Sequence, residues 1–316
     1  MRALITRLRS NKVREKVLVG DWPDPGTPTG NQVRTRTLFS GVTNGTERND
    51  LLGGNYAHRD DELPAGWGYQ NVGEVVELGP DVTRLAIGDV LYMSQDHMEF
   101  CLEPDDGLHI KLPDEVDRMH AALFGMAAVA RRSCRHAGLR AGDRFLVVGA
   151  GCIGQIAAQI AAVMGARVTL CDIDEHRLEV ARAIAAAESV VNVEGDNWAN
   201  HVPERGFDAV LDVAGVPGME DKLIVAAADG GTVLFVAGRG KVEYTFNDGQ
   251  WREITIKQSS HFDTGDLDDV CRLVAGGTVR IGPLVHDVVP VSEAKRIYDT
   301  LRDQPKRILG TVFDWS

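Results

Sequence analysis

Two different spacings of apolar residues divide the chain. Up to about residue 118 the apolar positions form short alternating runs, such as 72–78 (VGEVVEL), which Gly, Pro and Asp interrupt as between β-strands. From Asp143 onward, runs typical of buried strands alternate with runs at helical spacing. This alternation is typical of a parallel sheet covered by helices. The pattern therefore predicts an α/β protein.

The domain organisation follows from where these patterns change. An alanine-rich helical pattern over 119–138 separates the β-rich segment from the alternating one. After about residue 264 come two helical patterns and short strands, a segment too small to fold alone. We expect one domain of residues 1–118 and 265–316, and a second domain of residues 119–264.

A glycine-rich motif follows the strand pattern RFLVV and opens a helical pattern. Gly149, Gly151 and Gly154 have the spacing GxGxxG. In this context Gly149 permits a tight turn, Gly151 lets the backbone approach a pyrophosphate, and Gly154 lets the helix pack closely on the strand. The motif predicts a dinucleotide site at the start of that helix.

The end of the next strand pattern bears on the choice of dinucleotide. Asp172 lies 18 residues beyond Gly154, close to the spacing of about 20 expected for a carboxylate that binds ribose hydroxyls. A carboxylate there repels a 2′-phosphate, so NAD(H) is favoured over NADP(H). Arg177 either softens this discrimination or lies on a solvated helix face.

Two later strand patterns end in small residues, DVAG (212–215) and FVAG (235–238). Ligands bind at the carboxyl ends of parallel strands, and small residues there let the backbone approach a nicotinamide ring. Plain strand-to-helix turns are the alternative. The candidate cofactor-binding residues are Gly149, Gly151, Cys152, Ile153, Gly154, Asp172, Ile173, Arg177, Ala214, Gly215, Val236, Ala237 and Gly238.

The composition indicates which classes of partner are disfavoured. The 316 residues are 44% hydrophobic and 25% charged, with a net charge of −12, which disfavours nucleic acid and anionic membranes. We see no signal-peptide core and no run of 18 apolar residues. Five cysteines without a CxxC pair indicate reduced thiols. We expect a cytoplasmic protein that acts on a small molecule.

An ordered set of segments resembles the medium-chain dehydrogenase/reductase superfamily, in its alcohol dehydrogenase-like group. The segments are SGVTNGTE (40–47), GYQNVGEVVELG (68–79), IGDVL (87–91), HMEFCLEP (97–104), AGLRAGDRFLVVGAGCIGQ (137–155), LDVAG (211–215) and GGTVLFVAG (230–238). The resemblance implies a GroES-like β-barrel catalytic domain, with a Rossmann NAD-binding domain inserted before the last segment. It also implies a homodimer or homotetramer, with GTVLFVAG as the edge strand that extends the sheet. Arg307 takes a position where relatives have a basic residue near the cofactor phosphates, unless it is a surface charge.

The zinc-dependent branch of this superfamily differs at its ligand positions. Thr43 replaces a Cys, Tyr69 replaces the His of a Gly-His-Glu motif, and the third ligand aligns near Gly125. Zinc needs three or four N, S or O ligands, so we expect no metal and no zinc. The motif SGxxxGTE resembles a zinc-free subgroup that includes bacteriochlorophyllide a 3-hydroxyethyl dehydrogenase.

Without zinc, a side chain must exchange the proton of the alcohol. The resemblance indicates two loops, with the candidate catalytic residues Tyr69, Thr46, Glu47, Asn44, Thr43 and Gln70. Tyr69 is the first candidate, provided that its pKa is lowered, with Thr46 and Glu47 as a relay behind it. In the alternative interpretation Tyr69 packs with its hydroxyl on the backbone and Glu47 caps a helix.

These features together indicate a zinc-independent, NAD(H)-dependent dehydrogenase. It would interconvert a secondary alcohol and a ketone on a medium-to-large substrate, such as a secondary metabolite, a sugar-like compound or a pigment. One alternative is an NAD(P)H-dependent enoyl or quinone reductase. Another is a nucleotide-binding protein without catalysis.

Overall fold

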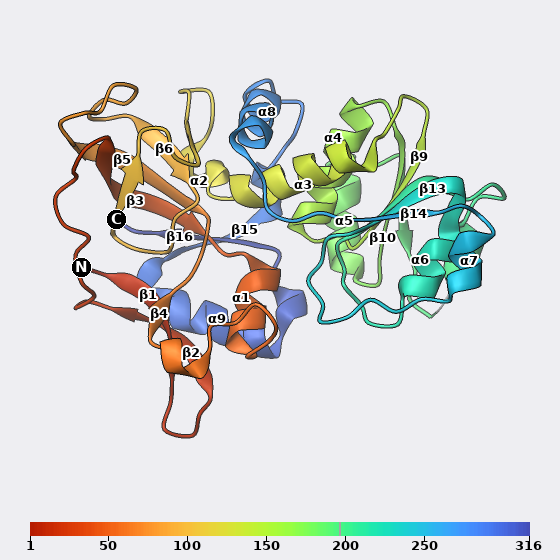
Figure 1. Ribbon diagram of the computed structural model, residues 1–316, viewed down its shortest axis with the longest axis horizontal. Coiled ribbons are helices and arrows are strands. Elements are labelled where there is room, and N and C mark those ends of the chain that lie inside the picture. Colours follow the sequence, from red (N-terminus) through yellow and green to blue (C-terminus); the bar gives the residue numbers. More distant parts are fainter. Residues whose placement is uncertain (196) are drawn as a thin grey trace. The chain divides into compact units, whose positions relative to one another are not determined.

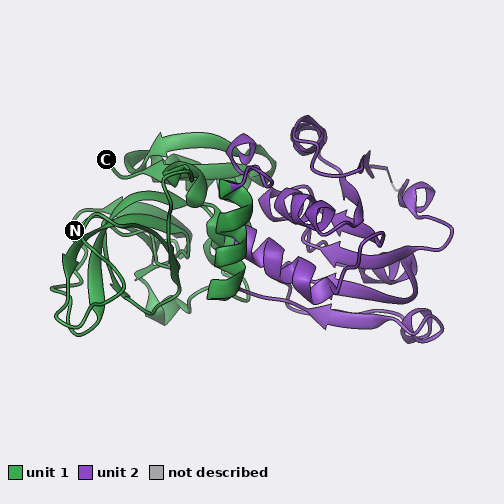
Figure 2. Ribbon diagram, turned by 90° about the horizontal axis from the view of Figure 1, so that it is seen from above, with its two compact units in different colours: residues 1–125, 263–275, 285–316 green, residues 126–262, 276–284 purple. Residues whose placement is uncertain are grey.

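The computed structural model describes residues 1–195 and 197–316, which form two compact units (Figure 2). The first unit comprises Met1–Gly125, Asp263–Ala275 and Val285–Ser316. The second comprises Met126–Phe262 and Gly276–Leu284. The domain limits drawn from the sequence, at 118 and 264, stay predictions.

The first unit contains two sheets (Figure 1). The smaller one is antiparallel, in the order β2 (Arg14–Val19), β1 (Ala3–Leu8) and β4 (Ala65–Gly66). The larger one has the order β15-β16-β3-β5-β6-β8, with β7 also paired to β3. Its strands are β3 (Gln32–Gly41), β5 (Asn71–Leu78), β6 (Val90–Met93), β7 (Phe100–Pro104), β8 (His109–Lys111), β15 (Val285–Pro290) and β16 (Gly310–Asp314). Because β16 pairs with β3, the end of the chain completes the sheet that the N-terminal segment begins.

Helix α9 shows how the first unit buries its core. Ile297, Tyr298 and Leu301 lie on one face of α9, as expected for an amphipathic helix. They pack in one cluster with Leu4 of β1 and Phe313 of β16. The α-helices assigned wholly to this unit are α1 (Asn44–Leu51), α2 (Arg118–Ala121), α8 (Thr264–Ala275) and α9 (Ala294–Asp303). Short 3₁₀ helices cover Asp60–Glu62, Val291–Glu293 and Pro305–Arg307.

The helical pattern predicted over 119–138 is divided in the structure. Helix α2 ends at the cap residue Ala122, and α3 (Phe124–Ala137) begins two residues later. Asp117 starts α2, since its side chain accepts hydrogen bonds from the amides of Met119 and His120. The prediction of helix is correct, whereas that of a single helix is wrong.

The second unit is a doubly wound parallel sheet, which confirms the predicted α/β fold class with a Rossmann-type sheet (Figure 1). Its order is β11-β10-β9-β12-β13-β14, so the strand order reverses between β9 and β12. The strands are β9 (Arg144–Val148), β10 (Arg167–Asp172), β11 (Ser189–Asn192), β12 (Phe207–Asp212), β13 (Ala227–Phe235) and β14 (Thr255–Gln258). Because crossovers are right-handed, α4 (Cys152–Val163) and α5 (Glu175–Ala183) cover one face, and α6 (Glu220–Ala226) and α7 (Phe246–Gln250) the other. Two 3₁₀ helices cover Trp198–His201 and Gly282–Leu284.

The edges of this sheet differ from the sequence-based expectation. The segment GTVLFVAG belongs to β13 and the turn after it, and β13 pairs with β12 on one side and β14 on the other. The prediction that it forms the edge strand is therefore wrong, because β14 was not recognised in the sequence. Homodimer or homotetramer formation stays a prediction. Among the described residues, no helix is both long enough and apolar enough to cross a membrane.

Candidate active site and dinucleotide cradle

The three glycines of the motif form the turn between β9 and α4. Gly149 has a φ of +107°, a conformation that L side chains rarely adopt. A Cβ on Gly154 would lie 1.8 Å from the Gly149 carbonyl oxygen, so this glycine lets the helix and the turn meet. A Cβ on Gly151 would meet no atom within 4 Å. Gly151 is the N-cap of α4, and Cys152 and Ile153 form the first turn of that helix. The open space above Gly151 faces the end of the helix where anions bind.

The carboxylate of Asp172, at the end of β10, borders this turn. Its Oδ2 accepts a hydrogen bond from the Ala150 amide at 2.7 Å, and its Oδ1 accepts from the Ile173 amide at 2.7 Å and the Asp174 amide at 3.0 Å. Arg177 Nη1 lies 4.0 Å from Oδ2, and the Arg177 side chain is partly exposed. The structure thus brings the predicted ribose carboxylate to the glycine turn.

The two small-residue turns at the ends of β12 and β13 lie against each other. Gly215 has a φ of +66°, and a Cβ on it would lie 2.8 Å from the Cβ of Ala237. The amides of Val236 and Ala237 both donate to the Asp212 carbonyl oxygen, at 3.1 and 3.2 Å. Gly238 follows in the same turn. The structure therefore brings together the second set of predicted cofactor residues, 214–215 and 236–238.

An ion cluster that the sequence analysis missed fixes these turns. The Asp212 carboxylate accepts from the amides of Ala214 and Gly215, each at 3.0 Å, and pairs with the Arg239 guanidinium. Arg239 Nη1 also lies 3.2 Å from Glu220 Oε1. All three charged side chains are at most 7% exposed. The only sequence signal is an Asp that ends one strand and an Arg just after the next.

In the first unit, the predicted catalytic loops meet at the start of α1. The Tyr69 hydroxyl is hydrogen-bonded to the side chains of Thr43 and Thr46. Gln70 Nε2 donates to Thr43 Oγ1 at 3.1 Å and faces the Gly41 carbonyl oxygen at 3.5 Å. Four of the six candidates therefore form one hydrogen-bonded set.

The backbone and ring of Tyr69 are fixed from two sides. The Tyr92 hydroxyl donates to the Tyr69 carbonyl oxygen at 2.6 Å. A Cβ on Gly125 would lie 2.3 Å from that Tyr92 hydroxyl and 3.0 Å from the Tyr69 ring. Gly125 leaves the space that the ring of Tyr69 needs.

The pKa of Tyr69 is raised to about 12, and not lowered as the acid/base hypothesis required. Burial is the largest cause, and the Glu47 charge adds to it, while the hydrogen bonds from Thr43 and Thr46 lower the pKa in part. At neutral pH this side chain is therefore a phenol, the form that donates a proton.

Glu47 lies in a buried charged network, and its place in a relay behind Tyr69 stays a prediction. Its Oε1 accepts from the Thr43 amide at 2.6 Å, and its Oε2 accepts from Lys16 Nζ at 2.8 Å and from the Tyr298 hydroxyl at 2.5 Å. His97 Nε2 lies 3.2 Å from both carboxylate oxygens. The bond to the Thr43 amide ties Glu47 to the residue that precedes α1.

Asn44, the last catalytic candidate, and Arg307, the last cofactor candidate, lie outside these two clusters. Asn44 Nδ2 donates to the carbonyl oxygens of Ile308 and Leu309, at 3.1 and 2.7 Å, and so ties α1 to the C-terminal segment. Arg307 is exposed in the 3₁₀ turn of the first unit. Its contact with cofactor phosphates stays a prediction.

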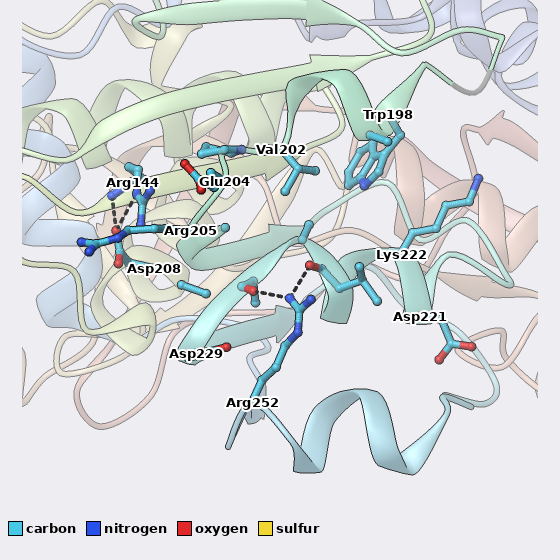
Figure 3. A pocket seen from close by; sticks show the side chains of 17 residues that line it. Arg144, Trp198, Val202, Glu204, Arg205, Asp208, Asp221, Lys222, Asp229 and Arg252 are labelled. Carbon is cyan, nitrogen blue, oxygen red and sulfur yellow. Dashed lines mark hydrogen bonds and ion pairs between the residues drawn. The ribbon is translucent and has the colours of Figure 1, made fainter.

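A cavity of about 910 Å³ in the second unit lies at the amino-terminal ends of the strands, opposite to the ends that carry the glycine turn (Figure 3). Arg144 and Asp208, near the starts of β9 and β12, form an ion pair in its wall. Arg252 donates to the carbonyl oxygens of Val225 and Ala227, at 2.7 and 3.0 Å. Because ligands of such sheets bind at the carboxyl ends of the strands, we do not assign this cavity to the cofactor.

Comparisons with known proteins agree with this geometry. Residues 152–276 match the family model described as zinc-binding dehydrogenase. The chain is 26% identical to a probable D-xylulose reductase A of Aspergillus clavatus over 74% of this chain and 76% of that protein. It is also 26% identical to sorbitol dehydrogenase 1 of Saccharomyces cerevisiae, over 75% and 78% of the two chains. The crystal structure of 2R,3R-butanediol dehydrogenase from Bacillus subtilis superposes with a TM-score of 0.84 at 20% identity, covering 100% of this chain and 99% of that one.

These comparisons support the resemblance to the medium-chain dehydrogenase/reductase superfamily. The relatives that the chain resembles are dehydrogenases and reductases, which supports an oxidoreductase activity.

The expectation that this protein uses no zinc is contradicted by these comparisons. The matching family model is that of zinc-binding dehydrogenases. The different residues at the ligand positions were therefore not enough to predict that the protein uses no zinc. Within residues 1–195 and 197–316, no three His, Cys, Asp or Glu side chains are grouped as a metal would require. The Tyr69 hydroxyl is engaged with Thr43, and Glu47 with Lys16, so these side chains do not fit a zinc site and no chemical step is derived through zinc.

Proposed function

We propose that this enzyme interconverts a secondary alcohol and a ketone on a sugar- or polyol-like substrate, with NAD(H) as the cofactor. Tyr69 donates the proton in ketone reduction, and its raised pKa limits its reverse role as a base to alkaline pH. The observation that carries the proposal is the hydrogen-bonded set of Gln70, Thr43, Thr46 and Tyr69. It supplies a positioned proton donor in the loops where the resemblance indicates the substrate.

The hydrogen bonds in this set have a defined direction. The amide nitrogen of Gln70 donates only, so Thr43 Oγ1 accepts from it. The Thr43 hydroxyl proton is then directed to the Tyr69 oxygen. Donors to this oxygen stabilise the phenolate, which is why these bonds lower the pKa of Tyr69 in part.

The proton balance of the reaction follows from this arrangement. Bound NADH supplies a hydride to the carbonyl carbon, and NAD⁺ accepts one in the reverse direction. In ketone reduction the Tyr69 phenol donates its proton to the carbonyl oxygen, which becomes the hydroxyl of the alcohol. In alcohol oxidation the Tyr69 phenolate must take that proton back, and the donors Thr43 and Thr46 stabilise it.

The substrate class and the cofactor rest on separate observations. The relatives at 26% identity are named for D-xylulose and sorbitol, which are a ketose and a polyol. The carboxylate of Asp172 at the glycine turn disfavours a 2′-phosphate and supports NAD(H).

The test is a panel of ketoses, polyols, simple secondary alcohols, enones and quinones, each offered with NADH or NADPH, or with NAD⁺ or NADP⁺. Turnover is read at the absorbance of the reduced nicotinamide, and the zinc content of each preparation is measured. We expect reduction of ketoses or ketones with NADH, and weaker activity with NADPH.

Two results would contradict the proposal. Activity confined to enones or quinones with NADPH would assign the enzyme to the reductases of double bonds. Stoichiometric NADH binding without turnover of any compound in the panel would remove the proposed alcohol chemistry.

A further inference from the structure

Lys16 contacts both segments that carry the candidate catalytic set. It lies in β2, and its side chain is fully buried. Its ammonium donates to Glu47 Oε2 at 2.8 Å and to the Trp67 carbonyl oxygen at 3.0 Å. It also lies 4.9 Å from the centroid of the Tyr298 ring. An ammonium has three protons, and a buried charge must be paired, so these partners account for its bonding.

The two hydrogen-bond partners of Lys16 are close in sequence to the proposed acid/base. Glu47 directly follows Thr46, and its other oxygen accepts from the Thr43 amide at 2.6 Å. Trp67 lies two residues before Tyr69. A single nitrogen therefore ties the start of α1 to the loop that carries Tyr69.

We propose that Lys16 is a positioning residue for proton transfer, because it holds the start of α1 and the loop before β5 together and so keeps Thr43 and Thr46 in contact with the Tyr69 hydroxyl. This inference rests on the proposed function. Proton transfer requires heavy atoms within hydrogen-bond reach, and a displacement of about 1 Å lowers rates by about 10²-fold. Lys16 acts through Tyr69 and does not touch the reacting atoms.

The ammonium of Lys16 lies among charged and aromatic side chains. Lys16 pairs with Glu47, which His97 also contacts, and it lies over the ring of Tyr298. Burial raises the pKa of Asp96, and the charge of Lys16 offsets part of that rise. Replacing a buried ion pair by groups of similar shape is often neutral for stability. A clamp between two loops, in contrast, is lost when its hydrogen bonds are lost.

The experiment uses a neutral pair in place of the ion pair. In Lys16→Met/Glu47→Gln no charge is left unpaired, and the Gln oxygen still accepts from the Thr43 amide, but the bond to the Trp67 carbonyl is gone. Glu47→Gln alone is the comparison that keeps Lys16. The matched control is Arg9→Met, in the segment after β1, which removes only a partly exposed ion pair with Glu15.

We expect kcat for ketone reduction with NADH to fall by about 10²-fold in the double variant relative to Glu47→Gln, with the KM for NADH unchanged. Arg9→Met keeps the wild-type kcat. Circular dichroism and the thermal midpoint verify that each variant folds. If the double variant folds and its kcat is within two-fold of the kcat of Glu47→Gln, the inference is overturned.

A second measurement does not depend on activity. In protein labelled with ¹³C at the tyrosine Cζ, the Tyr69 resonance is assigned from its loss in Tyr69→Phe. We expect this resonance to shift or broaden in the double variant, while that of the exposed Tyr244 stays in place. An unchanged Tyr69 resonance contradicts the clamp. If the wild-type enzyme turns over no ketone but the resonance moves, the proposed function fails and the clamp stands as a structural feature.

Discussion

The guanidinium of Arg239 pairs with the carboxylate of Asp212, and this ion pair joins the turns that end β12 and β13. Asp212 in turn accepts the amides of Ala214 and Gly215, and Arg239 also reaches Glu220. Both turns belong to the predicted nicotinamide side of the cradle. One arginine therefore controls the shape of the surface that a dinucleotide would contact.

Arg239→Met should weaken NADH binding and destabilise the protein, because Asp212 and Glu220 remain as buried, unpaired carboxylates. Breaking a buried pair costs about 3–5 kcal/mol. Urea unfolding measures the stability, and quenching of protein fluorescence measures the dissociation constant. Arg182→Met, which removes a more exposed ion pair with Glu175, is the control and should change neither. Unchanged NADH affinity in a folded Arg239→Met protein would show that the pair has no effect on the cradle.

Two glycines of the same turn should respond differently to alanine. A Cβ on Gly154 would overlap the Gly149 carbonyl oxygen, so Gly154→Ala should lower stability by about 1–3 kcal/mol or more. A Cβ on Gly151 meets no atom, so Gly151→Ala should fold normally and lose NADH affinity by at least about tenfold. Calorimetric melting and NADH titration separate the effects. Wild-type NADH affinity in Gly151→Ala would mean that the pyrophosphate does not approach this residue.

The second unit was predicted from the sequence because its signals are local. The strand before the glycines, the glycine spacing and Asp172 lie within 29 residues, from 144 to 172. Each is dictated by the geometry of one strand, one turn and one helix. The turn between β9 and α4 therefore has the arrangement that the motif predicts.

The charged network of the first unit was not predicted, because its partners are distant in sequence. Lys16 and Glu47 are 31 residues apart, and Tyr298 and Glu47 are 251 apart. In the N-terminal segment Lys16 is one of several scattered basic residues, and such a charge in a strand is normally solvated. Only the packing of α9 and α1 against β2 shows that Lys16 is buried.

Tyr69→Phe tests the acid/base. Removing the hydroxyl should lower kcat for ketone reduction by about 10²–10⁴-fold, the range for general acid–base catalysis. NADH affinity should stay unchanged, because the ring and its packing remain. Tyr244→Phe, at an exposed tyrosine, is the control. If turnover of Tyr69→Phe stays within a few-fold of wild type, Tyr69 is not the acid/base.

The rate of alcohol oxidation should rise with pH in the alkaline range. The pKa of Tyr69 is about 12, so the phenolate that accepts the proton becomes more populated as the pH approaches that value. Ketone reduction uses the phenol, so the part of its rate that depends on Tyr69 should not change between neutral and mildly alkaline pH. Initial rates in both directions across this range, compared with Tyr69→Phe, measure the effect. An oxidation rate through Tyr69 that is independent of pH would contradict this assignment.

The ion pair of Glu47 and Lys16 should make stability sensitive to acid. Burial alone would raise the pKa of Glu47, but the charges of Lys16 and His97 and their hydrogen bonds outweigh it and hold the pKa well below its usual range. The pKa is therefore lower in the folded than in the unfolded protein. Its contribution to stability is present above the unfolded-state pKa of about 4.3 and is lost as the pH falls toward the folded-state pKa.

Glu47→Gln isolates this contribution, because the amide has a similar shape and does not titrate. At neutral pH the variant should be less stable than wild type by about 3–5 kcal/mol. The difference should shrink as the pH falls below about 4.3, because the carboxyl of the unfolded wild-type protein then binds a proton while the folded protein stays ionised until the lower folded-state pKa. Urea unfolding of both proteins over this range measures it. A difference that stays constant with falling pH would mean that Glu47 carries no charge in the folded protein.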